Sequence, residues 1–273
     1  MDMDWTQLAA QWGVFLLLGA VAGVLAGLLG VGGGLVLVAA LAWLLPSMGV
    51  PVEAAMHAAL ASSLASIVLT AAASARAHAR RGSVSWPTVA WMVPGLLLGG
   101  WLGSAVAVGI DGAVLRWIVA GYCLLAAAQL LGGSRRGAGG PVVPPPRGWP
   151  MAAAGSAIGA VSAVVGIGGG SMTVPLLVWR GVVPVRAVGT SSACGVAIGL
   201  ASAAGYALHA PAGALPAYAM GYVYLPAAIG VAMASVLAAP WGTRLAHRLS
   251  GSALRRLFAA FLLAVALALA ATR

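Results

Sequence analysis

Charged side chains are scarce in this sequence: they make up 7% of its 273 residues, against about 25% in a soluble domain. Only four are acidic, and the fourteen basic ones are all arginine, since the chain has no lysine. So few charges cannot cover a surface that faces water, whereas apolar types make up 62% of the chain. The composition argues against a soluble enzyme, a disordered chain and a nucleic-acid-binding domain, and predicts a protein embedded in the lipid bilayer.

Cysteine is also rare, and neither copy suggests a cofactor. Cys123 and Cys194 both lie inside apolar runs, where a thiol packs as a small hydrophobic group. Two such residues give neither a disulfide framework nor a metal site, so we expect no cofactor and no bound metal. The acidic start, Met1–Trp5, lacks the basic region that opens a cleaved signal peptide.

Apolar stretches are abundant, and we predict all of them to be helices, because an open strand cannot satisfy its backbone hydrogen bonds in lipid. Two of them, 34–45 and 170–179, reach only about half of the roughly 30 Å hydrocarbon core at about 1.5 Å per residue. The predicted fold class is an all-α polytopic membrane protein. The stretches are 12–29, 34–45, 54–75, 87–109, 113–131, 150–166, 170–179, 187–208, 219–241 and 253–271.

The chain divides into two similar halves around 132–149, a segment rich in Gly, Pro and Arg that reads as a cytoplasmic linker. We predict a first transmembrane repeat at 8–131 and a second at 150–271. The run GVGGG at 30–34 recurs as GIGGG at 166–170, displaced by 136 residues, and the glycines before each run follow the same displacement. This ordered series of matches indicates an internal duplication.

The arginines predict the orientation of these segments. If loop 76–86 is cytoplasmic, alternation of the segments leaves only Arg116 and Arg273 outside and the other twelve arginines inside, as the positive-inside rule requires. The N-terminus then lies outside. The first half starts outside and the second inside, so the repeats are inverted, with Gly-broken or re-entrant half-helices. This architecture is typical of secondary transporters, which bind their substrate near the bilayer midplane.

The two glycine runs are the strongest candidate for a binding site. A broken backbone in the membrane must face protein or a water-filled cavity, and the helix after each break begins with free amide groups and a positive dipole end. Two such ends would form an anion site, to which the hydroxyls of Ser171 and Thr173 add donors. The alternative, close helix packing, suits Gly19, Gly23, Gly155 and Gly159 better. The candidate site glycines are Gly32, Gly33, Gly34, Gly168, Gly169 and Gly170.

A hydroxyl cluster recurs about one turn into a long helix of each half. Ser62 and Ser63 lie in the first half, and Thr190, Ser191 and Ser192 in the second. One alternative is that these hydroxyls bond the carbonyl four residues back, as they often do in membrane helices. The other is a shared role in substrate binding at the symmetric centre.

No carboxylate lies in the middle of a predicted span, whereas a cation carrier or a proton relay usually has one there. This favours an anionic or neutral substrate. Glu53 follows Pro51 at a helix start, where an acid complements the helix dipole. His57, one turn deeper, is a coupling candidate together with Glu53, because the two can exchange a proton; the alternative is a histidine that only satisfies a helix end.

Four segments resemble one known family. They are AGLLGVGGGLVLV at 26–38, GIGGGSMTVPLL at 166–177, AVGTSSA at 187–193 and the loop SARAHARRGSVSW at 74–86. Together they resemble the TauE/SafE family of sulfite and sulfonate exporters, within the 4-toluene sulfonate uptake permease superfamily. The resemblance extends over both halves. It implies a carrier of sulfur oxyanions or small organic sulfonates that usually exports them across the bacterial inner membrane.

The first half departs from the family pattern. Ala39 stands where the second half has Pro175, and Ala61-Ser62-Ser63 replaces a Gly-Thr-Ser sequence. We therefore expect the first half-site to be looser or differently selective.

Two other functions remain open on the sequence alone. A passive anion channel differs from a carrier only in its coupling, which no motif decides. An intramembrane serine hydrolase would need Ser191 or Ser192 in contact with His209, which a continuous helix would hold about 25 Å away. The expected partners are a small anionic substrate and the bilayer, without nucleic acid, and a homodimer is left open.

Overall fold

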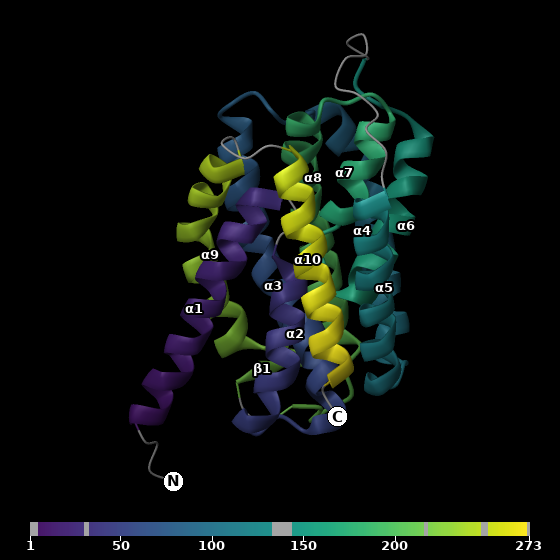
Figure 1. The fold of residues 1–273 in the computed structure, drawn as a ribbon. Coiled ribbons are helices and arrows are strands. Elements are labelled where there is room, and N and C mark those ends of the chain that lie inside the picture. Colours follow the sequence, from purple (N-terminus) through teal and green to yellow (C-terminus); the bar gives the residue numbers. More distant parts are fainter. Residues whose placement is uncertain (1–4, 30–32, 133–143, 216–217, 247–250, 272–273) are drawn as a thin grey trace.

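The computed structural model describes residues 5–29, 33–132, 144–215, 218–246 and 251–271, which form a bundle of helices (Figure 1). Residues 30–32, the first three of the glycine run at 30–34, and most of the linker lie outside the described residues. The helices are α1 (Trp5–Leu29), α2 (Gly34–Leu44), the short 3-10 helix η1 (Leu45–Met48), α3 (Val52–Ala79), α4 (Trp86–Val108), α5 (Gly112–Gly132), α6 (Trp149–Val165), α7 (Gly170–Trp179), α8 (Pro184–Leu208), α9 (Leu225–Ala246) and α10 (Gly251–Ala271).

The one departure from the predicted helices is at the start of segment 219–241. Residues 219–224 form a small antiparallel hairpin, in which β1 (Ala219–Met220) pairs with β2 (Val223–Tyr224). Gly221 in its turn has φ +57°, and a Cβ at this glycine would overlap the backbone carbonyl of Ala207. The backbone therefore turns here, and α9 begins only at Leu225.

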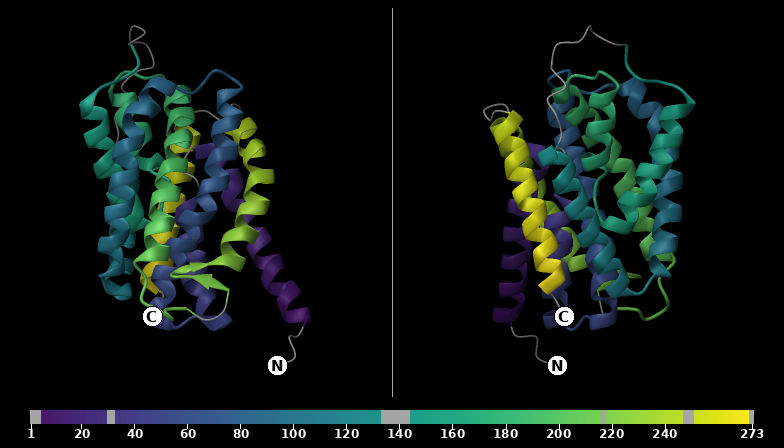
Figure 2. Two further views of the ribbon diagram at one scale, coloured as in Figure 1. Left: turned by 180° about the vertical axis from the view of Figure 1, so that it is seen from behind. Right: turned by 45° about the vertical axis from the view of Figure 1, so that its right-hand side comes forward.

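Six of the described helices are long and apolar enough to cross a membrane: α1, α3, α4, α5, α8 and α9. Their outer surfaces carry large apolar side chains such as Leu17, Leu98, Leu125 and Leu237, which are 57% to 76% exposed. A water-soluble monomer rarely exposes so much contiguous apolar surface. The two short helices α2 and α7 lie within the bundle and do not extend across it (Figures 1 and 2).

The main helix contacts join the two halves of the chain. Helix α1 of the first half packs along α9 of the second half, and α6 of the second half packs along α4 of the first half in the corresponding way. The long helices α3 and α8 pack against each other and are the most buried of the spanning helices, while α2 packs on α3 and α7 on α8. Neither half therefore forms a bundle by itself.

Glycines allow the close approach of the outer helix pairs. A Cβ on Gly23 of α1 would meet the backbone of Ser235 on α9, and a Cβ on Gly159 of α6 would meet the backbone of Leu96 on α4. Gly19 and Gly155 face backbone atoms of the same partner helices in the same manner. The packing role that the sequence predicts for these four glycines is confirmed.

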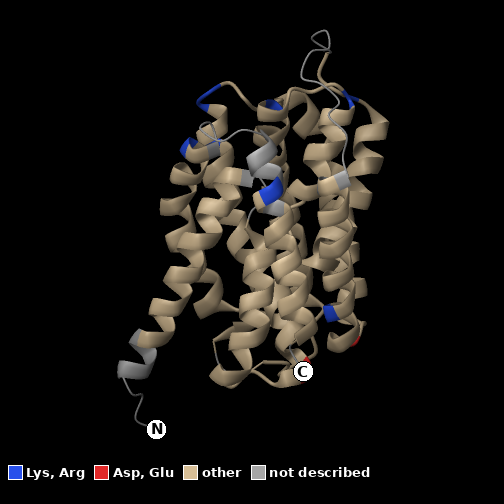
Figure 3. Ribbon diagram, viewed as in Figure 1, with Lys and Arg blue, Asp and Glu red and all other residues tan. Residues whose placement is uncertain are grey.

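Charged residues separate along the long axis of the bundle. Among the described residues, the arginines gather mostly at one end and the acidic residues lie at the other (Figure 3). The hairpin β1–β2, the start of α1 and the end of α10 all lie at the acidic end (Figure 2). The bundle thus has an arginine-rich end and an arginine-poor end, as a membrane protein with one side facing the cytoplasm would have.

Candidate functional site

Both glycine runs break the backbone at equivalent places. Gly33 and Gly169 adopt left-handed conformations, with φ +70° and +73°, and each directly precedes a short helix, α2 or α7. Gly166, with φ +77°, ends α6. A side chain in this region costs about 1–2 kcal/mol, so each turn favours glycine. Gly32 lies outside the described residues, while Gly168, Gly169 and Gly170 are all buried.

The two breaks meet at the centre of the bundle. A Cβ on Gly34 would overlap the carbonyl oxygen of Gly166 and lie 3.2 Å from the Cα of Ile167. The hydroxyl of Ser63, on α3, is fully buried and donates to the carbonyls of Gly34 (3.1 Å) and Gly166 (3.2 Å). One serine side chain therefore connects the break of the first half with that of the second.

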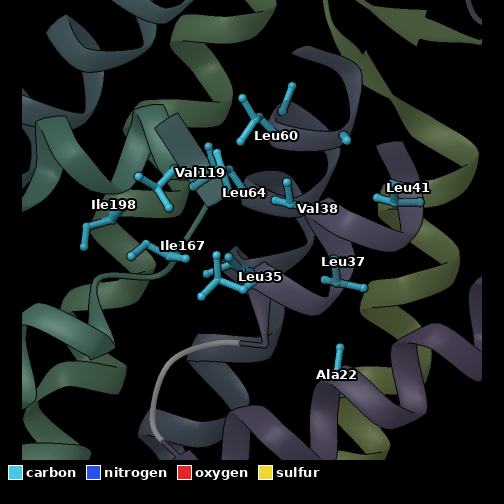
Figure 4. Close-up of a cluster of buried hydrophobic side chains, with 14 of the residues drawn as sticks. Ala22, Leu35, Leu37, Val38, Leu41, Leu60, Leu64, Val119, Ile167 and Ile198 are labelled. Carbon is cyan, nitrogen blue, oxygen red and sulfur yellow. The ribbon is translucent and has the colours of Figure 1, made fainter. Parts of the chain in front are cut away.

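Apolar side chains surround this meeting point. Leu35 and Val38 of α2, Leu60 and Leu64 of α3, Ile167 of the second break and Ile198 of α8 gather around it (Figure 4). They keep water away from the breaks, and in such a low-dielectric environment a polar group interacts more strongly with a charge.

The start of α7 offers free hydrogen-bond donors. The carbonyl of Gly169 accepts the amides of Met172 (3.1 Å) and Thr173 (2.8 Å). The amides of Gly170 and Ser171 stand ahead of them at the first two helical positions, where an N–H has no partner within the helix. These groups and the positive end of the helix dipole can bind an anion without a charged side chain.

Two polar residues near this helix start, Tyr122 and Ser162, were not predicted from the sequence, whereas Thr173 was. The hydroxyl of Tyr122, on α5, lies 2.5 Å from that of Ser171. The hydroxyls of Ser162 on α6 and Thr173 on α7 are fully buried and have no hydrogen-bond partner within the described part of the chain. In the sequence each missed residue is a lone polar side chain within an apolar span, a pattern that does not reveal which neighbour the side chain faces.

The recurring hydroxyl cluster separates into different roles in the structure. Ser63 bonds to the breaks, whereas Ser62 accepts the amide of Tyr224 (2.9 Å) and Thr190 accepts that of Ser85 (2.9 Å). Ser192 donates to the carbonyl four residues back, Val188 (3.1 Å), as the alternative interpretation proposed. Ser191 is fully buried beside them. Ser62 and Ser63 also lie nearer the middle of α3 than the one turn expected, because α3 already begins at Val52.

Replacing Thr190 with valine is expected to destabilise the protein by about 1–3 kcal/mol, because the buried amide of Ser85 would lose its acceptor. Thermal unfolding of the purified protein measures this loss, with Thr190→Ser as the control that keeps the hydroxyl. An unchanged melting temperature in the valine variant would mean that the Ser85–Thr190 bond contributes nothing to stability.

His57 and Glu53 separate in the structure. Glu53 is exposed in the first turn of α3, whereas the ring of His57 is 5% exposed and stacks on Tyr222, with ring centroids 4.8 Å apart. The Nε2 of His57 lies 2.9 Å from the carbonyl of Ile110 and 3.2 Å from that of Ala107, so it must donate. The structure therefore has His57 linking α3 to the C-terminal end of α4.

A hydrolytic site is not formed at the hydroxyl cluster. Ser192 and His209 belong to one continuous helix, α8, and its C-cap, so about 25 Å separate them along the axis. His209 instead packs edge-on against Trp101, at 4.8 Å between ring centroids. Among the described residues, no group of three His, Cys, Asp or Glu side chains is placed to hold a metal ion.

Comparison with known proteins agrees with this arrangement. Residues 15–269 match the family described as "Sulfite exporter TauE/SafE". A Haemophilus influenzae protein named "Probable membrane transporter protein" is 34% identical over 255 residues, which cover 92% of this chain and 95% of the relative. No solved structure matches the chain. The matched region includes both glycine runs, most of α1 and all of the other spanning helices, and the family is one of transporters rather than enzymes. This chain is a multi-pass membrane protein that belongs to the TauE/SafE family of membrane transporters.

Proposed function

We propose that this protein is a secondary transporter that exports a small sulfur-containing anion, sulfite or an organosulfonate, across the bacterial inner membrane. The observation that carries the proposal is the meeting of the two glycine breaks, each of which precedes the N-terminus of a short helix. Free amides and two positive dipole ends near one point favour an anion. The name of the matched family supports a sulfur oxyanion as this anion.

The architecture proposed for this transporter is a pair of inverted repeats. The packing of the first helix of each half supports it, since α1 packs on α9 of the second half just as α6 packs on α4 of the first half. The breaks before α2 and α7 then lie at equivalent positions of the two repeats. Movement of one repeat against the other would expose their meeting point first to one side of the membrane and then to the other.

The orientation proposed places the arginine-rich end in the cytoplasm and the start of α1 outside, in accordance with the positive-inside rule. Cysteines introduced at Arg80, after α3, and at Ala210, after α8, are therefore expected to react with a membrane-impermeant thiol reagent from opposite sides. The native thiols of Cys123 and Cys194 are buried, so we expect little background labelling from them. Labelling of both positions from the same side would contradict the inverted arrangement.

Uptake into proteoliposomes tests the function. Purified protein would be reconstituted and offered labelled sulfite, sulfate, thiosulfate and a small sulfonate, with and without a pH gradient. A carrier for sulfur anions is expected to take up sulfite or the sulfonate and to accumulate it when a gradient is applied. Equilibration without accumulation under every gradient would instead indicate a passive channel, and no flux of any of the anions would refute the proposal.

His57→Gln is expected to retain most of the sulfite flux driven by a pH gradient. The Nδ1 of His57 is buried and has no partner among the described residues, so the structure shows no group that passes a proton to or from this nitrogen. Sulfite can carry its own proton as bisulfite, and glutamine still offers a donor to the carbonyls of α4. Flux with and without the gradient measures the effect, with Glu53→Gln as a comparison. Loss of the gradient response at unchanged protein level would make His57 the coupling residue.

A further inference from the structure

The two glycine breaks are similar in backbone but opposite in side-chain chemistry. Ser171 is the second residue of α7, and the second residue of α2 is Leu35. By the displacement of 136 residues, Thr173 corresponds to Leu37 and Ser162 to Ala26. These three counterparts in the first half are at most 2% exposed and belong to the apolar core. These three side-chain hydroxyls beside the second break thus have apolar counterparts at the first.

The same difference extends to the helices that follow. Tyr122 is the eleventh residue of the 21-residue helix α5, and Phe261 is the eleventh residue of the 21-residue helix α10. The tyrosine hydroxyl lies 2.5 Å from Ser171 at the start of α7, whereas phenylalanine has no hydroxyl to offer. A duplicated half that served only packing would have no reason to retain four hydroxyls around one helix start.

Ser162 shows that these hydroxyls face the helix start. Its Oγ lies 3.4 Å from the position that a Cβ of Gly169 would occupy, and Gly169 is the N-cap of α7. The side chain is fully buried and has no partner in the described part of the chain. A buried hydroxyl without a partner is unfavourable, because it has lost its hydrogen bonds to water, and a ligand that accepts its hydrogen bond would remove this cost.

We propose that the transported anion binds at only one of the two breaks, the start of α7, where Ser162, Thr173 and the Tyr122–Ser171 pair supply hydroxyl donors beside the free amides. The start of α2 is its apolar counterpart. This inference rests on the proposed function and adds to it a single, one-sided site for an oxyanion with several acceptor oxygens. Gly168, Gly169 and Gly170 are buried, so entry requires neighbouring side chains such as Ile198 to move.

The test measures binding of labelled sulfite to the purified full chain in nanodiscs, for the parent protein, Ser162→Ala and Tyr122→Phe. The parent is expected to bind one sulfite per chain. Each variant is expected to raise the Kd about tenfold, because it removes one donor to a charged ligand. Ser162→Ala is also expected to keep or raise the melting temperature, since it removes a hydroxyl that has no partner in the described protein.

Ser235→Ala is the matched control. Its hydroxyl is equally buried, but it donates to the carbonyl of Gly19 (2.8 Å) between α9 and α1, so the control should lower the melting temperature and leave the Kd unchanged. Two sulfites per chain, or a Kd within twofold of the parent in both Ser162→Ala and Tyr122→Phe, would overturn the one-sided site and leave the proposed function standing. Absence of both binding and transport in the parent protein would refute the proposed function itself, and the inference with it.

Discussion

Replacing Gly169 with leucine is expected to abolish transport while the protein still inserts and folds. Gly169 has φ +73°, and a Cβ there would collide with the end of the Ile198 side chain. The left-handed backbone adds about 1–2 kcal/mol of strain, which a folded domain with a typical stability of about 5–15 kcal/mol survives. The leucine side chain would fill the space beside the first amides of α7, so an anion could no longer approach them.

Initial uptake rates in proteoliposomes measure this effect, normalised to the amount of protein that elutes as a single species. Gly13→Leu is the control, because Gly13 is exposed on α1 and a Cβ there meets nothing within 4 Å. Gly33 is a less specific target, since a Cβ at Gly33 would overlap the backbone carbonyl of Ala22, which cannot move aside as a side chain can. Uptake at the parent rate in Gly169→Leu would remove the second break from the binding site.

Replacing Gly99 with leucine is expected to have the opposite outcome, a loss of folded protein. Gly99 lies where α4 packs along α6, and a Cβ there would overlap the carbonyl oxygen of Ser156 and lie 2.9 Å from the amide nitrogen of Ala160. Both are backbone atoms of a helix, so the two helices would have to separate. Overpacking of this kind costs about 3 kcal/mol, and separation also removes the packing contacts that hold helices together in lipid.

Thermal unfolding and the yield of monodisperse protein measure this loss. Gly121→Leu on α5 is the matched control, because a Cβ at Gly121 meets nothing within 4 Å; this variant should unfold at the parent temperature. If Gly99→Leu were as stable as the control, the packing role of the α4 glycines would be wrong. The two predictions separate glycines that hold helices together from glycines that shape the site.

Much of the candidate site could be predicted from the sequence, because glycine runs inside apolar segments have few physical explanations in a membrane. The positions of both breaks and the short helices after them are found as expected. The predicted hydroxyl cluster was less informative, since serine and threonine in a helix can bond to their own helix, to a neighbouring loop or to a ligand. The sequence could not distinguish Ser63, which bonds to both breaks, from Ser62 beside it, which accepts the amide of Tyr224.

The sequence by itself determined the class of the protein and the order of its helices, because both follow from local composition: too few charges for water, apolar runs of spanning length and glycine breaks between them. It predicts a duplication for the same reason, since a repeat in the sequence can be found without knowing where it lies in space. Only the tertiary structure decided which helices meet. The packing of α1 on α9 and α6 on α4, the contact of both breaks with Ser63 and the approach of Tyr122 to Ser171 join residues from 29 to more than 200 positions apart. Such contacts depend on how two complete halves fit together, which no local pattern contains.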